Sequence, residues 1–297
     1  MLSLLNDMAF SEQQLEKWGE PINETHQIKC QNTIDEIKTL LSAKFGNKVT
    51  LSLQGSYKNR TNIKIDSDVD ILIKYNGVNF VNRQFLTPEH DRLYELYRTP
   101  ATYTFSQFKN DVYDVLKTRY PYSAERKNKC IRIKESEDRV KADVVPCFKH
   151  RRLKTFDEAS AIGIELITDS GESVISFPEQ HYENGNIKNK DTNYNYKPTV
   201  RALKHIRKHL EDNGIIEPEY MSSFFIECLV WNTNHFHFTG SRKEVLTKIT
   251  RQIWYDMNQL KHAEYTEVSD LRWLFKGNGH DYKKAEKFMW EAYSILK

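Results

Sequence analysis

Two aspartates separated by one residue stand out as groups that could do chemistry. Asp68 and Asp70 lie in the run 68–74, where apolar residues alternate with polar ones, and this alternation predicts a half-buried strand. Residues i and i+2 of a strand point to the same face, so the two carboxylates should lie side by side. Adjacent carboxylates repel each other unless a cation binds them, and Mg²⁺ prefers oxygen ligands. The pair therefore predicts a divalent-metal site.

A third acid would complete a site for two metal ions. Asp143 lies among apolar residues in the predicted strand 139–148, where an acid without a partner would be disfavoured. We expect Asp68, Asp70 and Asp143 to be the catalytic and metal-binding residues, with two Mg²⁺ or Mn²⁺ ions that drive phosphoryl transfer. The alternative is that Asp143 merely pairs with a basic neighbour on its own strand, Lys141 or Arg139.

The segment between the first predicted strand and the two acids is suited to phosphate binding. Gln54 is the last residue of the predicted strand 48–54, Gly55 and Ser56 follow it, and Asp68 comes twelve residues after Ser56. A glycine lets the backbone approach a ligand closely, so amide groups and the Ser56 hydroxyl could hold a triphosphate. Gln54, Gly55 and Ser56 are therefore predicted nucleotide-binding residues.

The acids Asp66, Asp68 and Asp70 also invite a calcium-loop interpretation. The pattern fails because Ile71 stands where such a loop needs glycine, and Gly77 stands where it needs glutamate. We expect Asp66 to be a solvated loop acid or a group that contacts the metal ligands indirectly.

The surrounding pattern predicts an α/β lobe followed by helices. Beyond the strands named above it comprises a helix over 23–45, a polar stretch around 76–102, a helix over 106–119, a strand over 130–134 and a hairpin over 163–177. Four amphipathic helices follow, at 198–210, 220–231, 241–260 and 282–296. The Asn-rich stretch 184–195 reads as a linker or loop.

Composition narrows the function classes. The formal net charge is +3, from 44 basic and 41 acidic residues, so small anionic substrates fit better than long nucleic acids. No signal peptide or membrane-spanning run is evident, and the four cysteines lack metal-ligand spacing, which predicts a soluble cytoplasmic protein in a reducing compartment. No membrane partner is expected.

These motifs together resemble the nucleotidyltransferase superfamily of polymerase β. The sequence Gln54-Gly55-Ser56-Tyr57 with Thr61, and Ser67 to Ile71, is most similar to the bacterial cGAS/DncV-like nucleotidyltransferases, or CD-NTases, and most nearly to their E clade. Further similar motifs are Phe177-Pro178, Lys188-Asn189 with Thr192, Tyr196-Lys197 with Val200-Arg201 and Lys204, and Ser223 to Glu227 with Trp231-Asn232.

The resemblance implies a template-independent synthase of a cyclic dinucleotide or oligonucleotide second messenger in bacterial anti-phage (CBASS) defence. It implies ATP and UTP as substrates, with GTP or CTP as further candidates, and a product that can contain uridine. Lys204, Ser222 and Ser223 would contact the donor triphosphate, although the two serines could instead cap a helix. A downstream effector would respond to the product rather than bind the enzyme, which is expected to be a monomer.

The fold implied is a polymerase-β-like catalytic lobe with a twisted mixed sheet over 1–180, closed by a C-terminal helical lobe over 181–297. Two other functions stay open. One is a nucleotidyltransferase that extends RNA or modifies another acceptor, and the other is a noncatalytic nucleotide-binding module.

Overall fold

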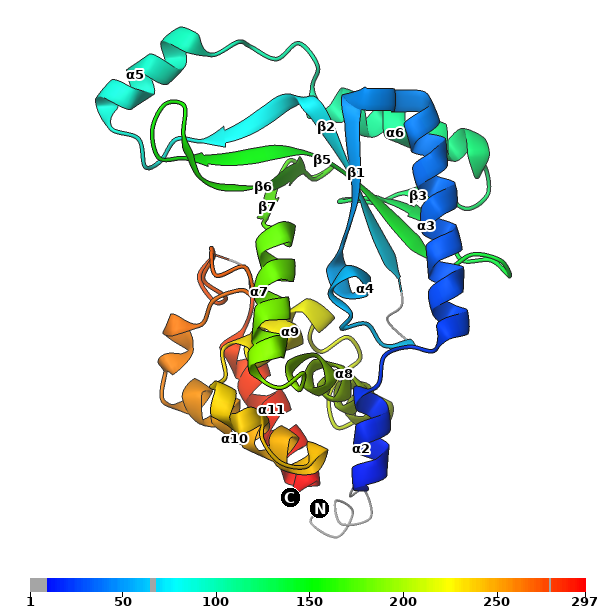
Figure 1. Ribbon diagram of the computed structural model, residues 1–297, viewed down its shortest axis with the longest axis vertical. Helices are drawn as coiled ribbons and strands as arrows, with labels where there is room; N and C mark the ends of the chain where they lie inside the picture. Colours follow the sequence, from blue (N-terminus) through cyan, green and yellow to red (C-terminus); the bar gives the residue numbers. More distant parts are fainter. Residues whose placement is uncertain (1–9, 65–67, 278) are drawn as a thin grey trace. The chain divides into compact units, whose positions relative to one another are not determined.

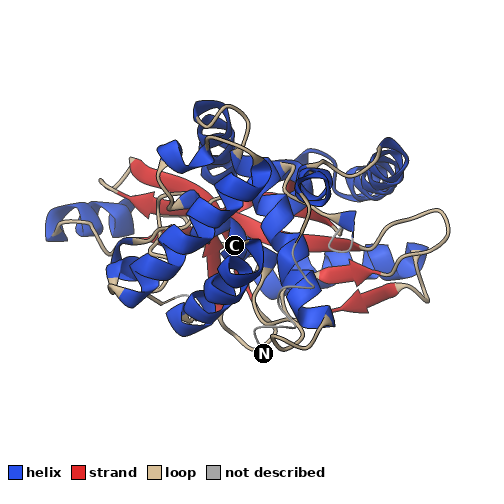
Figure 2. Ribbon diagram, turned by 90° about the horizontal axis from the view of Figure 1, so that it is seen from below, coloured by secondary structure: helices blue, strands red, loops and turns tan. Residues whose placement is uncertain are grey.

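The computed structural model describes residues 10–64, 68–277 and 279–297. Their contacts divide the chain into two compact units. The sheet unit comprises Asn23–Tyr57 and Ser67–Pro178, and the helical unit comprises Met1–Ile22, Lys58–Asp66 and Glu179–Lys297. Every named strand of the described residues belongs to the sheet unit, whereas the named elements of the helical unit are helices. Figure 2 distinguishes the helices from the strands by colour. The mixed α/β part followed by helices confirms the order predicted from the sequence.

The sheet unit is organised around one mixed sheet of seven strands (Figure 1). The neighbouring order is β1-β2-β5-β4-β3, while β6 pairs with the second half of β5 and with β7. Only β2 and β5 run parallel, and the other pairs are antiparallel. The strands are β1 Val49–Gln54, β2 Val69–Asn82, β3 Ala124–Arg126, β4 Ile131–Ile133, β5 Ala142–Leu153, β6 Ala159–Ile167 and β7 Ser173–Ser176.

The long strand β2 differs from the prediction that it would end near Lys74. It continues to Asn82, with an irregularity between Tyr75 and Asn79, because β5 also continues and pairs with its second half. A short helix, α5 (Pro88–Tyr97), follows within the predicted polar stretch, and its N-cap is Thr87. Pairing with β5 therefore extends β2 beyond the point where its apolar and polar residues stop alternating.

Two helices cover one face of the sheet. α3 (Glu24–Phe45) and α6 (Phe105–Arg119) pack their apolar faces on alternate residues of β2 and β5, as 3.6-residue and two-residue periodicity require. Val69 and Ile71 are fully buried in this core, together with Val144. Their strand neighbours Asp70 and Asp143 point to the opposite face of the sheet.

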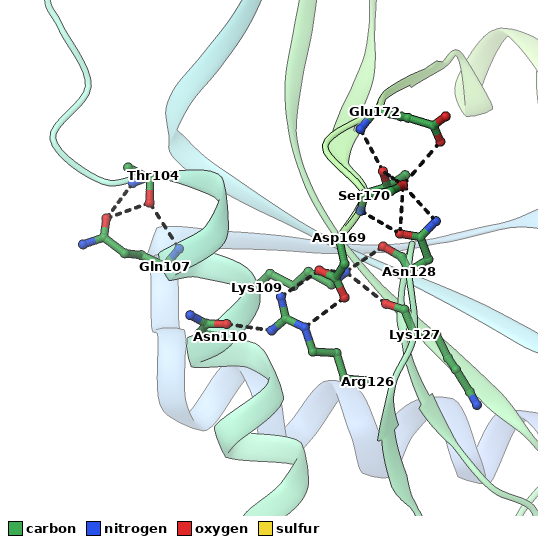
Figure 3. Close-up of polar contacts among 11 residues, drawn as sticks. Thr104, Gln107, Lys109, Asn110, Arg126, Lys127, Asn128, Asp169, Ser170 and Glu172 are labelled. Carbon is green, nitrogen blue, oxygen red and sulfur yellow. Dashed lines mark hydrogen bonds and ion pairs between the residues drawn. The ribbon is translucent and has the colours of Figure 1, made fainter.

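A buried lysine fixes α6 to two turns of the sheet (Figure 3). Lys109 is 1% exposed, and its Nζ donates to the carbonyl oxygens of Lys127 and Asn128 and to Asp169 Oδ1 at 2.8–3.0 Å. Arg126 also donates to both oxygens of Asp169, at 2.8 and 3.0 Å. Because each donor of the buried ammonium has a partner, the cation is compatible with burial.

The helical unit has its own apolar core. Its helices are α2 Glu12–Gly19, α7 Pro178–Asp191, α8 Tyr196–Asp212, α9 Ser223–Trp231, α10 Arg242–Asn258 and α11 Tyr282–Leu296, and the five-residue α4 Gly55–Asn59 begins in the sheet unit and ends in this one. Among the described residues, no helix is long and apolar enough to cross a membrane.

The prediction of a linker or loop over 184–195 is wrong for most of that stretch. Residues up to Asp191 belong to α7, despite their poor intrinsic helix propensity. Tertiary hydrogen bonds compensate for it: Asn184 donates to the Val268 carbonyl at 2.8 Å, and Lys188 donates to the Trp231 and Thr233 carbonyls. These partners lie far away in sequence, so local pattern could not reveal them.

Candidate active site

The central feature is a row of side chains that crosses four neighbouring strands. The strand register places Gln54 opposite Asp70, Asp70 beside Asp143, and Asp143 opposite Arg132. Residues paired in this way project from the same face of a sheet. The row therefore brings two of the predicted acids together on the face opposite α3 and α6, and Asp68 precedes Asp70 by two residues.

The central acid is destabilised as an anion. Burial, followed by repulsion from the carboxylates of Asp143 and Asp68, raises the pKa of Asp70 from its ordinary 3.8 to about 7. The positive charges of Arg132 and Lys141 act in the opposite direction. A divalent cation would remove this penalty, because an opposite charge favours the ionised form.

The two outer acids already have protein cations as partners. Arg132 donates from Nε and from a terminal nitrogen to the two oxygens of Asp143, each at 2.8 Å. Lys141 Nζ lies 2.5 Å from Asp68 Oδ2. Within the described part of the chain, no three acid, histidine or cysteine side chains converge closely enough to hold a metal ion.

Arg132 is the residue that sequence reasoning missed. The expected alternative partner of Asp143 was Lys141 or Arg139 on its own strand, whereas the observed partner comes from β4. The alternation Ile131-Arg132-Ile133 indicates that the arginine leaves the core. It does not give the register that places this arginine opposite Asp143.

Gly55 lies against the central acid. It has φ +72°, and a Cβ at this position would stand 2.1 Å from Asp70 Oδ2. Glycine is therefore required both by the backbone conformation and by the space. Gly55 opens α4, which also contains Ser56. The structure thus brings the predicted glycine turn together with the acid pair, as the sequence pattern requires.

The remaining predicted site residues belong to the helical unit. Lys204 is fully buried in α8, and its Nζ donates to the Thr61 carbonyl at 2.7 Å. Ser222 is the N-cap of α9, where its side chain accepts from the Phe225 amide, and Ser223 begins that helix. Their contact with a triphosphate stays a prediction. Asp66 lies outside the described residues.

Known proteins are similar to this chain in sequence. A profile of the cGAS/DncV-like nucleotidyltransferase C-terminal helical domain matches residues 183–297. A cyclic dipurine nucleotide synthase of Elizabethkingia meningoseptica is 43% identical over 97% of this chain and 99% of its own. A cyclic dipyrimidine nucleotide synthase of Legionella pneumophila is 33% identical over 96% of this chain and 98% of its own.

Two solved structures share the fold over nearly the whole chain. The E. meningoseptica CdnE cyclic dinucleotide synthase with GTP and Apcpp superposes with a TM-score of 0.82 at 40% identity, covering 97% of this chain and 99% of that one. The Rhodothermus marinus CdnE c-UMP-AMP synthase with Apcpp and Upnpp gives a TM-score of 0.81 at 29% identity, covering 95% of each chain.

Proposed function

The chain belongs to the cGAS/DncV-like nucleotidyltransferases, within them to the CdnE group, and from this premise we propose that it joins nucleoside triphosphates into a cyclic dinucleotide. The observation that carries the proposal is the row in which Gln54, Asp70 and Asp143 lie on three neighbouring strands, with Gly55 directly after β1 and against Asp70. Relatives named as synthases of cyclic dinucleotides support this reaction. The product would act as a messenger for an effector protein in anti-phage defence.

We further propose that Asp68, Asp70 and Asp143 hold two Mg²⁺ or Mn²⁺ ions. Carboxylate oxygens are the donors that hard cations prefer, and the strand register places Asp70 beside Asp143, with Asp68 two residues before Asp70. When bound, such ions neutralise the charge that develops on the transferred phosphoryl group and on the leaving pyrophosphate.

The residues of the chain have separate tasks in this proposal. Asp143 accepts the proton of the attacking hydroxyl group, and the turn at Gly55 and Ser56 presents backbone amide groups to the triphosphate. Lys204 and Ser223 are proposed to contribute to triphosphate binding. The hydrogen bond from Lys204 to the Thr61 carbonyl supports an indirect part in it, since residue 61 lies on the segment that follows the turn.

The bases of the product are the finer part of the proposal. The E. meningoseptica relative is named for a dipurine product, whereas the relative from R. marinus is named a cyclic UMP-AMP synthase, at 33% identity over 88% of this chain. We propose a cyclic dinucleotide that can include uridine. ATP and UTP, with GTP and CTP, are therefore the substrates to test.

The test is product analysis with one substitution. The purified chain is incubated with all four ribonucleoside triphosphates and Mg²⁺ or Mn²⁺, treated with phosphatase, and analysed by mass spectrometry. We expect a phosphatase-resistant cyclic dinucleotide, which identifies the bases. Asp68→Asn should retain part of its nucleotide binding and lose turnover by a factor of about 10³ or more, on the scale of other catalytic electrostatic groups.

Other results would assign another function. Retained turnover in Asp68→Asn would contradict the role of the acids. Linear oligomers or extended RNA would favour a transferase that acts on another acceptor. Nucleotide binding without turnover with either metal would favour a noncatalytic binding module.

A further inference from the structure

We propose that Arg132 and Lys141 are resident counter-ions of the acid triad, and that divalent metal ions bind there by displacing them. This inference rests on the proposed function in one respect, namely that Asp68, Asp70 and Asp143 are metal ligands. It adds that Arg132 and Lys141 pair with these acids before a metal ion binds. Metal binding then replaces protein cations with metal ions.

The contact between Arg132 and Asp143 is the stronger of the two. Both carboxylate oxygens receive a hydrogen bond from the guanidinium at 2.8 Å, which is the bidentate geometry of a tight ion pair. The Asp143 side chain is 14% exposed, so water screens the pair only partly. The opposite register positions of β4 and β5 hold the two side chains together.

Lys141 provides the second counter-ion by a different route. It lies one residue before β5, and its Nζ is 2.5 Å from Asp68 Oδ2, with the two side chains 38% and 35% exposed. The central Asp70 makes no ion pair within the described ranges, although both cations reduce its pKa shift. Two protein cations therefore face three acids, and the central acid has no cation of its own among the described residues.

The ion pair predicts that a metal ion and Arg132 compete for the carboxylate of Asp143. A divalent ion close to Asp143 would lie beside a guanidinium of the same sign, and the two repel each other at short range. The opposite possibility is that Arg132 helps the metal by orienting Asp143, as partners of metal ligands commonly do. Removing such a supporting group weakens metal affinity by roughly 10- to 100-fold. The two possibilities therefore predict changes of opposite sign.

The experiment measures metal binding directly, without turnover. Free Mn²⁺ is followed by electron paramagnetic resonance during titration of the full-length protein in the absence of nucleotide. The Asp70→Asn variant identifies the part of the binding that belongs to the triad. We expect Arg132→Gln to bind Mn²⁺ about fivefold more tightly than the native chain, which corresponds to about 1 kcal/mol for one partly exposed ion pair.

Lys134→Gln is the matched control. Lys134 directly follows β4 and pairs with Glu125 rather than with an acid of the triad, and the substitution changes the net charge by the same amount. We expect its Mn²⁺ affinity to stay within about twofold of the native value, because exposed charges at a distance are screened by salt. The control separates local competition from the overall charge of the protein.

Unchanged or weaker Mn²⁺ binding by folded Arg132→Gln would overturn the exchange. If thermal melting shows that this variant is unfolded, Lys141→Gln replaces it, because the Lys141 side chain is 38% exposed. Unchanged or weaker Mn²⁺ binding by Lys141→Gln would then overturn the exchange. Failure of the proposed function is distinguishable, because it appears as missing nucleotidyl transfer by the native chain. The Mn²⁺ comparison among the variants can still be made in that case.

Discussion

Gly55 occupies a position in the candidate site where a larger residue would be strained and would displace Asp70. Its φ of +72° is unfavourable for L-residues, and a methyl group would collide with the carboxylate of Asp70. We expect Gly55→Ala to lower turnover about a hundredfold, since a displacement of about 1 Å at a reacting centre has effects of that size. The measurement is the rate of product formation at saturating nucleotide.

Gly171 offers the control for this substitution. It has φ +88°, and a methyl group there would meet nothing within 4 Å. Gly171→Ala should therefore carry the backbone strain of about 1–3 kcal/mol without the collision. Equal losses of turnover in the two variants would show that strain, and not displacement of Asp70, explains the effect at Gly55.

The acids and the glycine could be predicted from the sequence because strand periodicity fixes the face on which each side chain lies. Asp70 and Asp143 each stand between two buried apolar residues of their strands, so both leave the core. The ion pairs of Arg132 and Lys141 could not be predicted in this way. They depend on which strands become neighbours and in which register, and these properties belong to the whole sheet.

At the scale of elements, the sequence predicts positions well where the apolar periodicity is strong. This applies to the strands β1 and β5 and to the helices α3, α6, α8 and α11. The prediction was wrong where distant partners decide the structure. β2 continues because β5 pairs with it, and α7 forms from Asn-rich sequence because its side chains bond to carbonyls elsewhere in the helical unit.

Lys188 makes the dependence of α7 on α9 measurable. Its buried ammonium donates to the carbonyls of Trp231 and Thr233 at 2.6 and 2.7 Å, just where α9 ends. Replacement by methionine leaves both carbonyls without this donor. We expect Lys188→Met to lower the free energy of unfolding by about 1–3 kcal/mol, measured by urea denaturation. The exposed Lys190 of the same helix gives the control, Lys190→Met, with little change expected.

The same lysine gives a pH dependence with a definite sign. Burial lowers the pKa of Lys188 from its ordinary 10.5 to about 8. Below pH 8 both folded and unfolded chains carry the proton, whereas between about 8 and 10.5 the unfolded chain binds more protons. Stability from this group therefore rises with pH in that window. The advantage of the native chain over Lys188→Met should grow between pH 7.5 and 9.5, and a shrinking difference would contradict the assignment.

At the scale of the whole molecule, the two units are not successive pieces of sequence. The segment Lys58–Asp66 belongs to the helical unit, although the residues on both sides of it belong to the sheet unit. Thr61 of this segment donates to the buried Glu227 at 2.9 Å, and its carbonyl accepts from Lys204. The helical unit thus depends on a segment from the first quarter of the chain.

A fragment of residues 181–297 should therefore fail to fold. Without residue 61, the buried Glu227 and Lys204 lose hydrogen-bond partners, and leaving buried charged groups in this state costs about 3–5 kcal/mol. Circular dichroism and thermal melting of the fragment should show no cooperative transition. The full-length Thr61→Val variant, which loses only the side-chain bond, should still melt cooperatively. A fragment that melts cooperatively on its own would contradict this dependence.

The segment Lys58–Asp66 also connects the helical unit to residues of the candidate site along the chain. In sequence it begins three residues after Gly55 and ends two residues before Asp68, and Thr61 within it is hydrogen-bonded to Lys204 of α8 and Glu227 of α9. The turn proposed to bind phosphate and the first proposed metal ligand therefore flank one and the same segment. We expect any displacement of α8 or α9 to be passed along this segment, because Thr61 is hydrogen-bonded to both helices.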